Sequence, residues 1–241
     1  IPNGFQAVLP AGTQILGVNI KDGTAIADFS EEFKEYQAED EQKILQAITW
    51  TLTQFDSIDK VQLRINGYDQ DVMPVDGTPI GDGFSRADGI NVDTGTMTDL
   101  TNSVGVTVYF LAQSSHGNYY VPVTKRVQNE ENNITATIKG LAEGPSLASG
   151  LFSDFSRELE LLEANADTDG KWTLNFNEAL LNNQKAISDE ALNALILSLT
   201  EHEEVKEFAI QVNGEENVLT ESGDALAQPV TREMMMDTME F

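Results

Sequence analysis

The amino-acid sequence predicts an α+β fold made of two tandem repeats, each a small β-sheet with helices packed on one face, with the first repeat N-terminally truncated. A duplication is predicted because Asp22-Gly23 recurs as Asp169-Gly170, and Asn66-Gly67 recurs at the same offset as Asn213-Gly214. Between these turns the apolar positions keep their register almost throughout, which chance does not produce.

Each repeat is expected to open with a β-hairpin. Two strand-like segments, Thr13–Ile20 and Ala25–Phe29, flank Asp22-Gly23, and Asp-Gly between apolar runs is a strong hairpin signal. The corresponding strands of the second repeat are Leu159–Ala166 and Trp172–Phe176. Both turn glycines, Gly23 and Gly170, are therefore expected in turns that contain positive φ angles.

A helix and a strand should follow each hairpin. Apolar residues fall at helical spacing through Ile44–Phe55 and Leu192–Leu199, and alternating apolar residues predict strands over Val61–Ile65 and Phe208–Val212. Residues 22–67 are thus expected to superpose on 169–214. Within these elements Leu52-Thr53 matches Leu199-Thr200. Beyond them, after a slip of one residue, Phe84-Ser85-Arg86 matches Val230-Thr231-Arg232.

The second repeat has a front half that the first repeat lacks. Strands are predicted over Val104–Phe110 and Tyr119–Val123, and a helix capped by Asn132 or Asn133 should end at Gly144-Pro145. By the repeat offset, the matching residues of the first repeat would precede Ile1. The sequence therefore predicts a first domain over residues 1–98, ending in a Gly-, Asp-, Pro- and Thr-rich tail and linker, and a second domain over residues 99–241.

Composition excludes several classes of function. The chain has 40 Asp and Glu against 14 Lys and Arg, a net charge of −26, so it repels nucleic acid and anionic lipid surfaces. It has no cysteine, which removes disulfides, thiolate nucleophiles and iron–sulfur clusters. No apolar run is long enough to span a bilayer. The absence of an initial Met suggests a piece of a longer protein.

One segment resembles the start of a calcium-binding loop. Asn165, Asp167 and Asp169 place oxygen-bearing side chains at alternate positions, as in an EF-hand. The twelfth position, which must supply a bidentate carboxylate, is Phe176. A hairpin turn explains the segment better than a calcium site does, and no metal site is assigned.

The other polar clusters carry no recognisable catalytic set. Acidic runs at Glu31-Glu32, Glu39–Glu41 and Glu201–Glu204 are interpreted as solvated helix ends or loops. His202 aligns with Phe55 of the first repeat, which favours packing, although a pH-sensing role stays open. His116 is expected in a turn between two strands. We therefore assign no catalytic and no cofactor-binding residue.

The C-terminal run Met234–Met236, with Met239 and Phe241, has two readings. It is either a partner-binding segment or a segment that packs along its own domain. Its alignment with Asp88–Ile90 of the first repeat favours packing.

Several strings resemble the pattern of the GerMN domain family. They are Leu9–Thr13, Asp22-Gly23 through Ser30, Thr51–Gln54, Val61 through Gly67, Val106–Phe110, Val121–Arg126 and Leu141–Pro145. The second repeat departs from this pattern, because Phe155–Leu159 stands where the first has Leu9–Thr13. The ordered set, rather than any single motif, carries the resemblance to tandem GerMN lipoproteins of spore formation and germination.

The resemblance implies a ring-building-motif fold and a non-enzymatic, extracytoplasmic protein, anchored to the membrane only by a lipidated cysteine upstream of this chain. It also implies protein partners of the SpoIIQ and SpoIIIA kind, in the complex between mother cell and forespore, and it brings no cofactor. Two hypotheses remain from the sequence: an assembly or scaffold protein, and a ligand- or cation-binding module of the cell envelope acting through Asp167 and Asp169.

Overall fold

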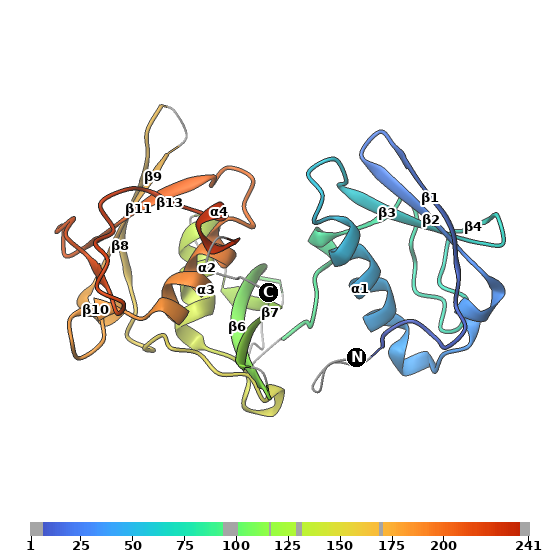
Figure 1. Ribbon diagram of the computed structural model, residues 1–241, viewed down its shortest axis with the longest axis horizontal. Coiled ribbons are helices and arrows are strands. Elements are labelled where there is room, and N and C mark those ends of the chain that lie inside the picture. Colours follow the sequence, from blue (N-terminus) through green and yellow to red (C-terminus); the bar gives the residue numbers. More distant parts are fainter. Residues whose placement is uncertain (1–6, 94–100, 116, 129–131, 169–170, 237–241) are drawn as a thin grey trace. The chain divides into compact units, whose positions relative to one another are not determined.

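The computed structural model describes residues 7–93, 101–115, 117–128, 132–168 and 171–236. The chain folds as two compact units, unit 1 over residues 1–91 and unit 2 over residues 92–241 (Figure 1). The domain boundary predicted between residues 98 and 99 lies outside the described residues. No helix in the described part of the chain is long and apolar enough to cross a membrane.

Unit 1 is a mixed sheet with one α-helix across it. Its elements are β1 (Ile15–Lys21), β2 (Thr24–Phe29), α1 (Glu41–Leu52), β3 (Lys60–Ile65), β4 (Tyr68–Gln70) and β5 (Phe84–Ser85). The strand order is β1-β2-β3-β4, with β5 also paired to β3. β1 and β2 are antiparallel, whereas β2 and β3 are parallel, so α1 is the crossover that joins them. Helix α1 ends at Leu52, before the predicted Phe55.

Unit 2 repeats this core and adds elements before it. The added elements are β6 (Ser103–Ser114), β7 (Gly117–Gln128) and α2 (Asn133–Glu143). The repeated elements are β8 (Leu161–Ala166), β9 (Trp172–Phe176), α3 (Asp189–Leu199), β11 (Glu207–Val212) and β13 (Val230–Thr231), with order β13-β11-β9-β8. A short parallel pair, β10 (Ala186–Ile187) and β12 (Leu219–Thr220), and α4 (Glu233–Met236) complete the unit.

The predicted duplication is confirmed at the level of strand pairing. β9 and β11 are parallel and are joined through α3, as β2 and β3 are joined through α1. Each first strand carries a register shift at its start, between Ile15 and Gly17 in β1 and between Leu161 and Glu163 in β8. The strands predicted for the front half of the second repeat form β6 and β7, and Asn132 caps α2 by accepting a hydrogen bond from Thr135 N at 2.8 Å.

The first hairpin has the predicted turn. Asp22 and Gly23 have φ angles of 49° and 74°, the pattern of a two-residue type I′ turn. A side chain at position 23 would also collide with the carboxylate of Asp59. Gly170, the matching glycine of the second repeat, lies outside the described residues.

Each unit has its own apolar core between helix and sheet. In unit 1 the core contains Phe29, Phe33 and Leu45, and in unit 2 it contains Phe176, Leu195 and Phe208. Met235 belongs to the core of unit 2 and is 4% exposed, whereas Met234 is 46% exposed. The packing interpretation of the methionine run therefore holds at Met235, while Met239 and Phe241 lie outside the described residues.

Candidate functional site

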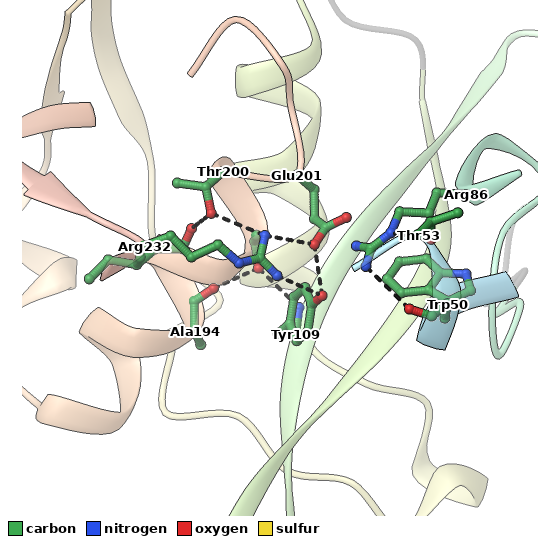
Figure 2. A network of polar contacts seen from close by, with 10 residues as sticks. Trp50, Thr53, Arg86, Tyr109, Ala194, Thr200, Glu201 and Arg232 are labelled. Atoms are coloured by element: carbon green, nitrogen blue, oxygen red, sulfur yellow. Dashed lines mark hydrogen bonds and ion pairs between the residues drawn. The ribbon is translucent and has the colours of Figure 1, made fainter. Parts of the chain in front are cut away.

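The polar side chains that recur in both units gather where each α-helix ends (Figure 2). In unit 1, Thr53 Oγ1 donates to the carbonyl of Thr49 at 2.8 Å, and Arg86 Nε donates to Thr53 Oγ1 at 2.9 Å. The guanidinium carbon of Arg86 lies 4.2 Å from the ring centroid of Trp50. Arg86 directly follows β5 and thus connects this strand to the C-terminal end of α1. A positive charge is favourable there because of the helix dipole.

Unit 2 makes the same connection with an additional partner. Thr200 Oγ1 donates to the carbonyl of Ile196 at 2.7 Å, and Arg232 Nη1 donates to Glu201 Oε1 at 2.9 Å and to Thr200 Oγ1 at 3.4 Å. Tyr109 OH donates to the same carboxylate oxygen of Glu201 at 2.8 Å. Burial alone lowers the pKa of Arg232, but Tyr109 and Glu201 outweigh it and raise the pKa, so the guanidinium stays charged.

Tyr109 also joins the front half of unit 2 to its repeated core. Its backbone N–H donates to Ser198 Oγ at 2.9 Å, and Ser198 Oγ donates to the carbonyl of Ala194 at 2.6 Å. Ser198 is fully buried. The side chains that Figure 2 draws around Arg232 therefore fasten β6, α3 and β13 together.

Glu41 departs from the predicted solvated acidic run because it is fully buried. Its Oε2 accepts hydrogen bonds from Tyr36 OH at 2.9 Å, Val75 N at 3.0 Å and Asp76 N at 2.7 Å, and its Oε1 accepts one from Thr78 N at 2.8 Å. Burial alone raises the pKa of Glu41, but the hydrogen bonds from Asp76 and Thr78 outweigh it and lower the pKa to about 2. This carboxylate holds a loop against the start of α1.

Two segments that carry the family resemblance, Val121–Arg126 and Leu141–Pro145, are in contact through Lys125. This side chain is 5% exposed, and its Nζ donates to the carbonyl of Gly144 at 2.7 Å. Nζ also lies 3.6 Å from Glu143 Oε2 and 3.8 Å from Asp93 Oδ2. A buried lysine needs such partners, so Lys125 holds the two segments together within unit 2.

The other sequence candidates that the structure describes have partners of their own rather than a shared site. Lys171 N donates to Asp167 Oδ1 at 3.0 Å, so this carboxylate closes the hairpin loop, and Phe176 is buried in the core. Asp169 and His116 lie outside the described residues. His202 Nε2 lies 2.8 Å from Thr137 Oγ1, and burial lowers the pKa of His202. Among the described residues, no group of three or more His, Asp or Glu side chains is arranged to hold a metal ion.

Sequence reasoning missed the role of these polar residues, although part of the signal was present. The alignment pairs Thr53 with Thr200 and Arg86 with Arg232, and both pairs occupy matching places in the structure. No sequence signal connects Glu41 to a loop more than thirty residues away, or Tyr109 to Glu201.

Fold and site together define a tandem α+β repeat protein whose shared polar side chains stabilise the C-terminal ends of its own helices. The family model described as Germane, sporulation and spore germination, matches residues 1–71 and 107–218. The spore germination protein GerM of Bacillus subtilis (strain 168) is 52% identical over 247 residues, covering 100% of this chain and 67% of that protein. The solved tandem GerMN domains of the sporulation protein GerM from Bacillus subtilis are 53% identical, with a TM-score of 0.88, covering 96% of this chain and 82% of that one.

The chain therefore belongs to the Germane family of sporulation and spore germination proteins, with two tandem GerMN domains. The resemblance noted from the sequence is confirmed.

Proposed function

We propose that this chain is a non-enzymatic assembly protein of sporulation and germination that acts outside the cytoplasm by holding partner proteins together. The observation that supports the proposal is that the polar residues shared by both units bind groups of their own unit. Asp28 and Asn175 bind turn amides, Thr53 and Thr200 bind helix carbonyls, and Arg86 and Arg232 bind these threonines. Duplication has preserved groups that support the fold.

In this proposal the partners are proteins of the SpoIIQ and SpoIIIA kind in the space between mother cell and forespore. The only membrane attachment is a lipid anchor upstream of this chain. An assembly protein of this kind needs a complementary surface of about 800 Å² per partner rather than a reactive group.

Site-specific photo-crosslinking in sporulating cells tests the proposal. A photoreactive amino acid replaces Phe55 or Tyr68, which are 63% and 76% exposed, and the buried Phe176 serves as the matched control. We expect a protein adduct from at least one exposed position and none from position 176. The double variant Asp167→Asn with Asp169→Asn should still support spore formation. A folded double variant that fails to do so would overturn the assembly proposal in favour of a bound cation.

A further inference from the structure

Both units carry an Asn-Gly pair in the same exposed turn. Asn66 and Gly67 have φ angles of 49° and 80°, and Asn213 and Gly214 have 51° and 81°. All four residues are exposed to solvent. Asn-Gly suits this type I′ turn because both positions require positive φ.

Asn-Gly is also the dipeptide most prone to spontaneous deamidation. The backbone nitrogen of the glycine attacks the side-chain carbon Cγ of the asparagine. Its proton passes through water to Nδ2, and the Cγ–Nδ2 bond breaks to release ammonia. Water then opens the resulting succinimide to give aspartate or isoaspartate. Exposure leaves both turns open to the water and base that these steps need.

The attacking nitrogen is restrained in both turns. Gly67 N donates to Asp28 Oδ1 at 3.0 Å, and Gly214 N donates to Asn175 Oδ1 at 2.9 Å. Asp28 and Asn175 occupy matching positions on β2 and β9. Attack on Cγ requires the glycine N–H to leave this hydrogen bond and the peptide plane to turn toward the asparagine side chain. Each acceptor therefore opposes the first step.

We propose that Asn66 and Asn213 are sites of spontaneous deamidation, and that Asp28 and Asn175 slow the reaction by holding the glycine nitrogens. The two acceptors differ in charge, so a comparison of them distinguishes restraint of the glycine N–H from base catalysis of the reaction. The carboxylate of Asp28 could serve as a base, whereas the amide of Asn175 cannot. Protection by both residues therefore assigns the effect to the hydrogen bond. This inference does not depend on the proposed function.

The test follows isoaspartate formation at both turns of the intact chain by peptide mapping with mass spectrometry during incubation at mildly alkaline pH, below the melting temperature. In Asp28→Ala we expect deamidation of Asn66 to accelerate about fivefold, the factor that corresponds to about 1 kcal/mol of lost hydrogen bonding. The rate at Asn213 in the same molecule should not change. Asn175→Ala should do the reverse, so each unit is the control for the other.

Two rescue variants keep a side-chain oxygen at each position. Asp28→Asn and Asn175→Asp should return the rates to within about twofold of the wild type, because each copies the acceptor of the other unit. Amide hydrogen exchange shows whether a variant has opened only locally: in Asp28→Ala, Gly67 N–H should lose protection while the β2–β3 ladder keeps it. Unchanged rates in both alanine variants with the turns folded, or slower deamidation in either, would overturn the proposal.

Discussion

Units 1 and 2 share a core, and unit 2 has further elements that cover it. In unit 2, α3 packs against β6 and α2 packs against β8. Unit 1 shows no counterpart of β6, β7 or α2 among the described residues 7–91. Within residues 7–91, Thr51 is exposed where its equivalent Ser198 is fully buried, and Ile15 and Val18 of β1 are 64% and 50% exposed.

This difference separates two contributions to the fold. The hairpin, crossover helix and parallel strand are specified within each unit by local turns and by their shared apolar face. In unit 2 the covering elements bury more of α3 and partly bury Leu161 and Ala164 of β8.

The largest effect is expected at the start of the two helices, where Glu41 of unit 1 aligns with Ser188 of unit 2. Glu41→Ala should reduce the free energy of unfolding of unit 1 by about 3 kcal/mol, since it leaves the amides of Val75, Asp76 and Thr78 without their partly buried acceptor. Ser188→Ala should cost unit 2 about 1 kcal/mol, the usual value of an N-cap. Urea titrations with Trp50 or Trp172 as the single tryptophan report each unit, and Glu39→Ala is the exposed control.

A smaller effect is expected where β6 packs against α3. Ser198→Ala should destabilise unit 2 by about 1–2 kcal/mol because Tyr109 N–H loses its buried acceptor. Thr51→Ala should leave unit 1 unchanged or slightly more stable, because alanine is the better helix former on an exposed face. Equal losses in both units, measured by the same titrations, would contradict the comparison.

The two units should also respond to acid over different ranges. The pKa of His202 is lowered by burial, so its contribution to the stability of unit 2 is complete above pH 6.5 and falls as the pH drops below that value. The pKa of Glu41 is lowered to about 2, so its contribution to unit 1 is complete above about pH 4.5 and is lost between pH 4.5 and 2. Melting curves against pH, compared with those of His202→Phe and Glu41→Gln, isolate the two contributions.

The smallest expected difference concerns the Asn-Gly turns of the wild-type chain. Asn66 Nδ2 donates to Glu31 Oε2 at 3.0 Å, a restraint that the described contacts of Asn213 lack. Asn213 should therefore deamidate about two to three times faster than Asn66, since an exposed hydrogen bond contributes at most roughly 0.5 kcal/mol. Mass spectrometry of aged protein gives both rates in one sample, and Glu31→Ala should remove the difference.

The fold was predictable wherever a short stretch of chain determines it. Asp22-Gly23 specifies a type I′ turn, and apolar spacing specifies α1, α3 and the strands beside them. Positions that depend on distant partners were not predictable. Nothing local distinguishes buried Glu41 from its exposed neighbour Glu39, because the difference is made by the amides of residues 75–78.

The same limit applies to the site. The repeat alignment marked Arg86 and Arg232, yet the contact of Tyr109 with Glu201 needs the three-dimensional arrangement of β6 beside α3. Glu201 belonged to a run interpreted as solvated, and its side chain is only 9% exposed because it lies between Tyr109 and Arg232.

The register slip between the repeats has a practical consequence for engineering. Gln14 bonds to Ser30 as Glu160 bonds to Asn177, so unit 2 has gained one residue in the hairpin between these pairs. It has lost one between Gly214 and Val230, relative to the segment from Gly67 to Phe84. The loop length at these two places can therefore change while the core stays the same. An epitope tag or fluorophore-binding peptide inserted in the turn between Thr220 and Asp224 would use a permissive position, because this turn is one residue shorter than its equivalent between Met73 and Thr78.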